Sequence, residues 1–555
     1  MVSIDSDQLW MVIVGFLIAF ALAFGIGAND VANSFGTSVG SGVITLKVAC
    51  ILASIFETLG AVLLGAKVSD TIRKGIIEVT PYQNDTSLFM VGNVAALSGS
   101  CLWLLAATLL RMPVSATHSI VGATIGFALV GHGASGINWS KLGLIIGSWF
   151  ISPIVSGAVS TGLFFFCKHF ILNKADPLEP GLKFLPVFYG LTIVINFFSV
   201  SYNGPKILGF DKIPLWGVFI ISFGGGIITA ILVLFAIVPW QRRKIRKQCD
   251  DPEYCPGSPI EKKDNSIKFE FGQLVDNSTA NSKNNSPLTQ QRELQHINLA
   301  NFQTTKIVNG VNNKNNDLNK KPGHNKAENA LLVDNEYNPG TQTPAGVSRS
   351  ETRTDLTYNI EHKPNGVKPP LSLEDPEASG RSVVKDRPET GELFSFLQIL
   401  TAIFGSFAHG GNDVSNAIGP LVSLWLVGTR GEVFEKAATP VWILFYGGVG
   451  ISIGLWVWGR RVIKTLGEDL TKITPSSGFC IEIGSALSVL IASNIGIPIS
   501  TTHCKVGSVV FVGRFRSKQN VDWKIFRNII FAWLVTLPIS GGISAAIMAA
   551  LKMTL

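Results

Sequence analysis

The sequence has few charged residues for its length. Of its 555 residues only 15% are Asp, Glu, Lys or Arg, whereas 47% are hydrophobic, and the mean hydropathy is +0.34. The polar residues are concentrated in one block, from about residue 241 to residue 392. The rest consists of apolar stretches near the roughly 20 residues that a helix needs to cross a bilayer. This composition excludes an ordinary soluble protein and predicts a polytopic membrane protein.

Cysteine is also scarce, and its distribution predicts no disulfide framework. The seven cysteines stand at positions 50, 101, 167, 249, 255, 480 and 504, mostly inside apolar stretches. No basic residue precedes the first apolar stretch, where Asp5 and Asp7 stand instead, so we expect no cleavable signal peptide.

The apolar stretches predict an all-α membrane protein with about twelve spans. They lie near residues 9–30, 48–66, 88–110, 114–131, 142–167, 186–203, 214–239, 394–427, 438–458, 478–497, 499–513 and 525–551. Basic clusters mark cytoplasmic helix ends. Three such clusters are Arg242 to Lys247, Arg460-Arg461 with Lys464, and Arg514-Arg516 with Lys518. With alternating spans all three face one side, so both termini are expected outside. The net charge of +8 therefore needs no nucleic acid to explain it.

These patterns divide the chain into three parts. Residues 1–240 form a first membrane block, residues 241–392 an insert, and residues 393–555 a second membrane block. The insert is rich in Asn, Lys, Ser, Thr, Pro and Gly and poor in aromatics, so it is predicted to be disordered and cytosolic.

Four glycosylation sequons differ in the side that they are expected to face. The sequon at Asn84 falls on an outside loop, where it can be glycosylated. The sequon at Asn138 is also outside but close to the membrane, and those at Asn277 and Asn284 are expected in the cytosol, unmodified.

Two motifs occur twice at nearly constant spacing. Gly27-Ala-Asn-Asp-Val-Ala-Asn-Ser recurs as Gly411-Asn-Asp-Val-Ser-Asn, with 383 residues between Asp30 and Asp413. Pro113-Val-Ser-Ala-Thr-His recurs as Pro498-Ile-Ser-Thr-Thr-His, 385 residues later. Trp149 and Pro153 are similarly matched by Trp533 and Pro538.

An odd number of spans separates the two copies, so they are predicted to run in opposite directions. Inverted internal repeats are typical of secondary transporters. The spans that begin at Pro113 and Pro498 are short and polar, and each is also compatible with a re-entrant hairpin.

The first motif has the side chains of a cation site. Asn29 and Asn33 share one helical face, with Asp30 beside them, and Asn412, Asp413 and Asn416 repeat the arrangement. Glycines at positions 25, 27 and 36 are expected to permit an unwound turn with free carbonyls. Such oxygens suit a hard cation such as sodium. The alternative is that these asparagines only tie helices together by hydrogen bonds.

The second motif is compatible with an anion site. Its hydroxyl residues lie at the start of a predicted helix, where free backbone amides favour an anion. These residues are Ser115, Thr117, Ser500, Thr501 and Thr502, with Ala116 at the position of Thr501. Helix capping is the alternative for the hydroxyls, and a structural role is the alternative to proton relay for His118 and His503.

Two isolated acids, Glu57 and Glu482, lie within apolar runs and are candidate functional residues. Glu482 aligns with Leu97 in the repeat, so the two acids are not repeat mates. We expect no Lys or Arg at the core of the twin motifs. Two aspartates and four asparagines without a neighbouring basic residue indicate a cation site. An anion can bind there only together with cations or protons.

At these residues the chain resembles the inorganic phosphate transporter (PiT) family. Residues 27–41, Gly-Ala-Asn-Asp-Val-Ala-Asn-Ser-Phe-Gly-Thr-Ser-Val-Gly-Ser, are similar to the family signature, and residues 409–420 are similar to its second copy. The long insert and the sequon at Asn84 are similar to the animal sodium-dependent branch. The likeness covers both membrane blocks.

The resemblance implies a plasma-membrane symporter for sodium and inorganic phosphate, with no other cofactor. Asp30 and Asp413 would then bind sodium, with Asn29, Asn33, Asn412 and Asn416 beside them. The five hydroxyl residues would hold phosphate, and Glu57 and Glu482 would be acids needed for transport. The expected partners are phosphate, sodium and membrane lipid, without nucleic acid, and a homo-oligomer stays open.

Three alternatives remain at this point. The coupling ion could be a proton, and the substrate another oxyanion such as sulfate or arsenate. The chain could instead be a phosphate sensor or surface receptor that signals through the insert. A hydrolase built on His118 or His503 is disfavoured, because no nucleophile motif stands nearby, so we expect no enzyme.

Overall fold

The structure is a computed structural model. It describes residues 6–204, 208–249, 384–431, 433, 437–459, 462–463 and 469–555, all within one compact unit. The described part is helical, without a strand, which confirms the predicted all-α class. The described residues also contain two isolated antiparallel β-bridges, Ile77 with Ile137 and Thr471 with Val521.

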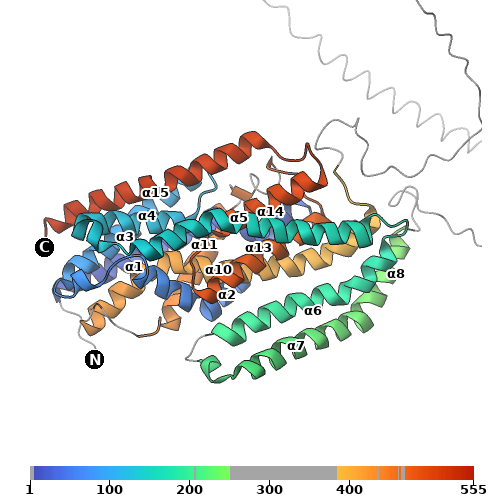
Figure 1. The fold of residues 1–555 in the computed structure, drawn as a ribbon, viewed down its shortest axis with the longest axis horizontal. Helices are drawn as coiled ribbons and strands as arrows, with labels where there is room; N and C mark the ends of the chain where they lie inside the picture. Colours follow the sequence, from blue (N-terminus) through green and yellow to red (C-terminus); the bar gives the residue numbers. More distant parts are fainter. Residues whose placement is uncertain are drawn as a thin grey trace, which may run out of the picture. The chain divides into compact units, whose positions relative to one another are not determined.

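The helices follow one another in chain order (Figure 1). The first block contains α1 (Ser6–Gly40), α2 (Leu46–Lys74), α3 (Thr86–Leu109), α4 (Ala116–His132), α5 (Trp139–Cys167), α6 (Leu178–Asn203), α7 (Leu215–Leu232) and α8 (Val238–Cys249). The second block contains α10 (Pro388–Arg430), α11 (Val441–Trp458), α13 (Pro475–Ile495), α14 (Thr501–Arg516) and α15 (Trp523–Lys552). Short π-helical segments extend α5 over Lys168–Leu172 and join α7 to α8 over Val233–Ile237.

Eleven helical segments of the described residues are long and apolar enough to cross a membrane, against about twelve predicted spans. The span predicted at 499–513 accounts for the difference. It is α14, whose 16 residues fall short of the roughly 20 that a crossing needs.

The insert is bordered by helix on both sides. α8 continues to Cys249 and α10 begins at Pro388, so both edges of the range 241–392 are helical rather than disordered. Residues 250–383 lie outside the described residues, and with them the sequons at Asn277 and Asn284.

Helices α3 and α4 form a hairpin, and so do α13 and α14. The open end of the first hairpin brings Tyr82, just before α3, to 4.4 Å from the ring of His132 at the end of α4. The open end of the second lies at the start of α10, where Arg516 pairs with Asp386 at 2.8 Å. Figure 1 shows the two hairpins toward opposite ends of the bundle. This arrangement matches the hairpin alternative for both short spans.

The tips of the two hairpins meet inside the bundle. Thr117 Oγ1 at the first tip donates to the Ile499 carbonyl at the second tip (3.0 Å). Thr502 Oγ1 donates to the Val114 carbonyl in return (3.3 Å). Asn29, well inside α1, also donates to the carbonyl of Met112 at the first tip (3.0 Å). The repeated motifs therefore converge on one place in the fold.

The expected unwound turns are absent, which corrects the sequence interpretation. α1 is continuous over Ser6–Gly40 and α10 over Pro388–Arg430. The glycines serve close packing instead, because a Cβ at Gly27 would collide with the Ile451 carbonyl and one at Gly410 with the backbone of Glu57. Small residues at helix contacts let backbones approach closely within a membrane.

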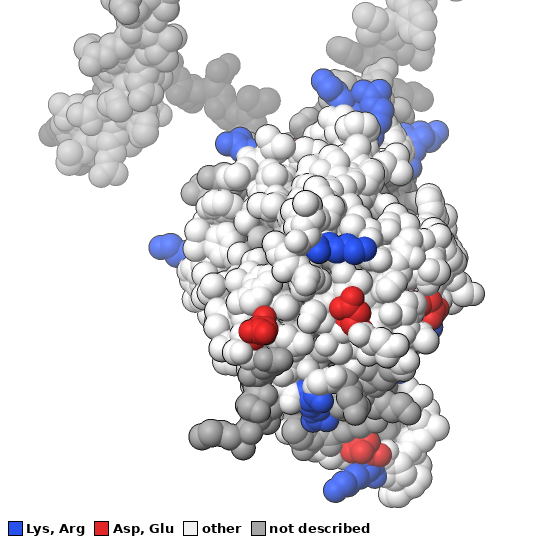
Figure 2. All heavy atoms as spheres, turned by 90° about the vertical axis from the view of Figure 1, so that its left-hand side faces the viewer, with Lys and Arg blue, Asp and Glu red and all other residues white. Residues whose placement is uncertain are grey.

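Two of the three basic clusters lie at one end of the bundle. Lys244 pairs with Glu392 at 2.9 Å, and Arg516 with Asp386, both beside the start of α10. Residues 460, 461 and 464 of the third cluster lie outside the described residues. α1 begins and α15 ends at the opposite end, which Figure 2 views and on which charged side chains of both signs are scattered.

Arg111 at the first tip is the one described non-glycine residue with a positive φ, at 59°. Its repeat mate, 385 residues later, is Gly496, with a φ of 84°. The left-handed conformation costs an L-residue about 1–2 kcal/mol, whereas glycine adopts it freely.

We expect Arg111→Gly to raise the melting temperature of the detergent-solubilised protein, because it removes this strain. Gly496→Ala is the matched control and should lower it, since its Cβ would also lie 3.3 Å from Lys67 Cγ. A lower melting temperature in Arg111→Gly would contradict the expectation.

Candidate functional site

Three titratable side chains cluster beside the hairpin tips. Asp30 on α1 and His409 and Asp413 on α10 each place one ligand atom within 4.8 Å of the others. His409 Nε2 lies 2.7 Å from Asp413 Oδ2, and its Nδ1 lies 3.3 Å from Oε1 of Glu57 on α2. Ser34 donates to that same Glu57 oxygen (2.7 Å). His409 thus lies between two carboxylates of different helices.

The asparagines and threonines of the two repeats are bonded crosswise. Asn33 on α1 donates to Thr502 of the second hairpin (2.9 Å), and Asn416 on α10 donates to Thr117 of the first (3.2 Å). Thr501 Oγ1 donates to Asp413 Oδ2 (2.6 Å). Each motif of one repeat therefore contacts the other motif of the opposite repeat.

Several acceptor oxygens at this place are buried without a hydrogen-bond donor. They are Asp30 Oδ2, Asn33 Oδ1, Glu57 Oε2 and Asn416 Oδ1. A buried oxygen without a donor costs free energy, and carboxylate and amide oxygens are the ligands that hard cations prefer. These residues thus have the chemistry of a cation site, and sodium binding at Asp30 stays a prediction.

Asn29 and Asn412, unlike Asn33 and Asn416, bond to the backbone of the hairpin tips. Asn29 Nδ2 donates to Thr108 Oγ1 and its Oδ1 accepts from the Val114 amide (3.1 Å). Asn412 Nδ2 donates to the Ile499 carbonyl (2.9 Å). Both amides tie a hairpin tip to a long helix, which is the structural alternative considered for them.

Ser115 and Ser500 cap the helices that begin at the tips. Ser115 Oγ accepts from the His118 amide and Ser500 Oγ from the His503 amide, each at 3.2 Å. Capping satisfies one first-turn amide and leaves others without an intrahelical acceptor. Thr117, Thr501 and Thr502 are the hydroxyls that face the opposite repeat.

His118 and His503 lie in a stack of aromatic rings. The His118 ring is 3.8 Å from that of Trp149, and the His503 ring is 3.7 Å from that of Trp533. His503 Nδ1 contacts the Trp149 carbonyl at 3.0 Å, and His118 hydrogen-bonds to the backbone of Trp533. This packing favours the structural role for both histidines.

Glu482 lies apart from the cluster around Asp30. Hydroxyls of Thr37, Ser38 and Thr401 donate to its carboxylate at 2.5–2.7 Å. Lys505 on α14 interacts electrostatically with it, and the Lys505 ammonium is buried without a hydrogen-bond partner. Lys505 follows the second motif by two residues, outside its core of residues 498–503, in which the sequence has no Lys or Arg. The repeat mates of Glu482 and Lys505 are Leu97 and Ile120, so the charged pair belongs to one repeat only.

The sequence interpretation missed several residues of this region. His409 precedes Asp413 by one helical turn, and this i, i+4 spacing could have identified it. The other missed donors carried no comparable signal, because their partners are remote in sequence. They are Ser34, Thr37, Ser38, Gln398 and Thr401.

We expect Glu482→Gln and Lys505→Met each to lower the melting temperature of the purified protein, because each leaves a buried charge without its partner. The two charges form no direct hydrogen bond or salt bridge, so each loss should be smaller than the about 3–5 kcal/mol typical of a broken buried ion pair. The double variant should recover part of the loss. Glu392→Gln is the control, since its pair with Lys244 is partly exposed and should contribute little. A double variant whose loss equals the sum of both single losses would show that the charges do not compensate.

Comparison with known proteins agrees with this architecture. The sequence profile of the phosphate transporter family matches residues 26–544. Sodium-dependent phosphate transporter 1 of Pongo abelii and that of Homo sapiens are each 46% identical, over 98% of this chain and 96% of their own length. Sodium-dependent phosphate transporter 1-B of Danio rerio has the same values.

A solved structure is similar as well. It is a sodium-dependent phosphate transporter, 28% identical, which superposes with a TM-score of 0.69 over 98% of this chain and 100% of its own. Transporters of this family are not an enzyme class. The family profile matches almost the whole chain, and relatives are 46% identical over nearly its full length. The chain therefore belongs to the phosphate transporter family.

Proposed function

We propose that this protein is a sodium-coupled symporter that imports inorganic phosphate across the plasma membrane. The observation that carries the proposal is the meeting of two helix N-termini, at Ala116 and Thr501, beside buried carboxylates from α1 and α10. Helix N-termini attract anions, and the carboxylates attract cations. The names of the relatives at 46% identity support the same substrate and the same ion.

Phosphate would bind between the two hairpin tips. First-turn amides of α4 and α14 would supply donors. The hydroxyls of Thr117, Thr501 and Thr502 would add theirs after turning from their present acceptors, Ile499, Asp413 and Val114. Ser115 and Ser500 hold these turns in place as caps.

Sodium would bind to the oxygens of Asp30, Asn33, Asp413 and Asn416. Asp30, Asp413 and Glu57 together offer three carboxylates, against one histidine, His409, within contact of two of them. Phosphate is itself an anion, so it enters this environment favourably only when cations arrive with it. This excess of negative charge is the physical origin of obligatory coupling in the proposal.

Transport would follow from alternating access between inverted repeats. The crosswise bonds between Asn33 and Thr502, and between Asn416 and Thr117, support a two-fold relation of the repeats. The membrane potential favours the inward movement of each net positive charge by a free energy of about 2.3 kcal/mol per 100 mV. A cation excess over the charge of phosphate would therefore make transport electrogenic.

The test is radiolabelled phosphate uptake into cells that express the chain, in sodium medium and then in choline medium. We expect uptake only in sodium, and we expect Asp30→Asn to reduce it to background, because the variant loses a buried anionic ligand. Asp211→Asn, at an exposed position between α6 and α7, is the matched control and should transport normally. Surface expression is measured for each variant.

Other outcomes would redirect the proposal. Equal uptake in choline would reject sodium coupling and favour protons. No phosphate uptake despite surface expression would favour another oxyanion or the receptor hypothesis.

The proposed orientation places both termini outside and the insert in the cytosol. Asn84 is exposed just before α3, at the end of the first hairpin that would face outward. We expect Asn84→Gln to remove the mobility shift that glycosidase treatment produces in cell-expressed protein. Asn138→Gln, whose side chain caps α5 through the Lys141 amide, should leave the shift in place. A glycosidase shift that persists in Asn84→Gln would contradict this assignment.

A further inference from the structure

Helix α8 continues a lipid-facing helix into a basic segment. α7, the π-helical segment and α8 form one helical stretch, Leu215–Gln248, in whose most apolar 18 residues only 22% are buried. Leu232 and Phe235 are 61% and 74% exposed, so this surface faces the bilayer. From Leu215 to Trp240 the helix rises about 38 Å, more than the roughly 30 Å of a hydrocarbon core. The residues after Trp240 therefore lie at the depth of the lipid headgroups.

One face of α8 holds the helix to the bundle. Gln241 and Ile245, one turn apart, are each 1% exposed. Beside this buried face, Arg242 and Arg246 both donate to Glu179 at the start of α6, at 2.9 and 2.8 Å. These two arginines are thus engaged by an acid of the chain itself.

The opposite face of α8 is basic and points away from the bundle. Trp240, Arg243 and Lys247 lie at i, i+3 and i+7, and all three are exposed. Lys244 on the flank pairs with Glu392 at 2.9 Å. Within the described part of the chain, by contrast, the side chains of Arg243 and Lys247 form neither an ion pair nor a hydrogen bond. The outward face thus carries two unpaired positive charges beside an aromatic ring.

The start of α15 repeats this pattern. Trp523, Arg527, Phe531 and Leu534 share one face of the helix, and the last two are 63% and 66% exposed to the bilayer. Trp523 and Arg527 are exposed in the turns before them, at the end of the bundle opposite to the end of α15 (Figure 1). Arg527 forms no ion pair with any described residue. Tryptophan followed by lipid-facing apolar residues is typical of a membrane–water interface.

We propose that the outward face of α8, formed by Trp240, Arg243 and Lys247, binds the headgroup of an anionic phospholipid. Charge complementarity carries the inference, because two unpaired cations at headgroup depth attract a lipid of net negative charge more than a zwitterionic one. Arg527 supplies a second contact of the same kind with a single charge. The inference goes beyond the proposed function and does not depend on the transported substrate.

A lipid bound to α8 should stabilise the folded protein. A ligand that binds only the folded state raises its stability. α8 is tied to α6 through Glu179 and to α10 through Glu392, so a lipid on its outward face supports the packing of the α6–α7 hairpin against α10. The melting temperature is therefore a suitable measure of binding.

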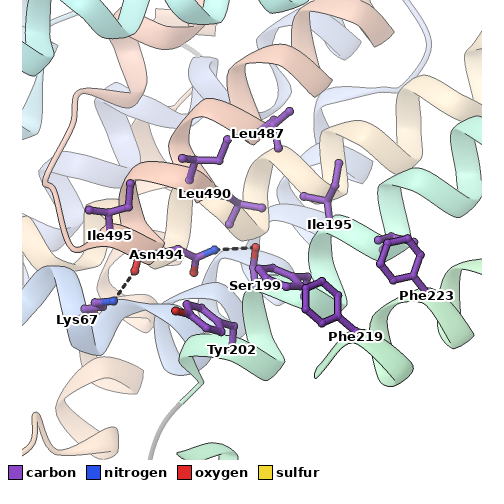
Figure 3. A pocket seen from close by; sticks show the side chains of 13 residues that line it. Lys67, Ile195, Ser199, Tyr202, Phe219, Phe223, Leu487, Leu490, Asn494 and Ile495 are labelled. Carbon is purple, nitrogen blue, oxygen red and sulfur yellow. Dashed lines mark hydrogen bonds between the residues drawn. The ribbon is translucent and has the colours of Figure 1, made fainter. Parts of the chain in front are cut away.

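The other end of the α6–α7 hairpin is apolar and supplies a control. A cavity of about 600 Å³ lies there between α6, α7 and α13, and aromatic side chains such as Phe219 and Phe223 line it (Figure 3). Mostly apolar walls can hold an acyl chain whatever the charge of its headgroup. Lys212, in the turn between α6 and α7, is exposed but stands beside Asp211.

The experiment measures the melting temperature of the full-length chain in nanodiscs of phosphatidylcholine alone and in nanodiscs with added phosphatidylserine. We expect phosphatidylserine to raise the melting temperature of the unmodified chain, and the Arg243→Gln/Lys247→Gln variant to lose at least half of that rise. In phosphatidylcholine alone the variant should melt as the unmodified chain does. High salt should also reduce the rise, because it screens exposed charges.

Three further variants complete the design. Arg243→Lys/Lys247→Arg keeps both charges and should keep the full rise. Lys212→Gln removes one exposed positive charge at the other end of the hairpin and should keep it as well. Arg527→Gln, added to the double glutamine variant, should remove the remaining rise.

Three results would overturn the inference. One is a melting temperature of the unmodified chain that phosphatidylserine does not raise, and another is a double glutamine variant that keeps the full rise. An equal loss of stability in both kinds of nanodisc would show that the basic face contacts the chain itself, for which Asp250, Asp251 and Glu253 stand next in sequence. Phosphate uptake tests the proposed function separately, so the two failures are distinguishable.

Discussion

Burial of carboxylates among apolar helices is the constraint on which the rest of this structure depends. Asp30, Glu57 and Asp413 are each about 1% exposed, in a bundle whose outer surface is largely aliphatic and aromatic. Unpaired charge in such surroundings costs several kcal/mol. Hydroxyl donors from α1 and the second hairpin, an amide donor from α10, and His409 between two acids offset this cost. Four acceptor oxygens of this cluster, on Asp30, Asn33, Glu57 and Asn416, remain without a hydrogen-bond donor.

The donors reach the acids because helix backbones pack unusually closely. Gly27 lies against the backbone of α11 and Gly410 against that of α2, and α1 and α10 are continuous beside these neighbours. Continuous helices hold Asp30 and Asp413 at fixed positions, whereas the hairpin tips approach them from opposite ends. The acids and the inserted tips together form the candidate site, to which both repeats contribute residues.

The sequence predicted a large part of this arrangement. Duplicated motifs identified Asp30, Asp413 and the tip hydroxyls, since polar residues repeated in an apolar chain rarely lack a shared role. Glycine was misread, because its freedom to unwind a helix and its smallness at a helix contact look identical in sequence. Lys505 was missed because it has no counterpart in the first repeat, where Ile120 stands. His409 was passed over although its spacing to Asp413 was visible.

The sequence by itself determined the class, the approximate number of helices and the residues that the two repeats share. These follow from local composition and periodicity, which act over a few turns of helix. Only the tertiary structure decided that the tips meet, that Asn33 bonds to Thr502, and that Glu482 is surrounded by hydroxyls from α1 and α10. Those contacts join residues up to several hundred positions apart. Their partners are set by how helices pack, and no pattern along the chain encodes that directly.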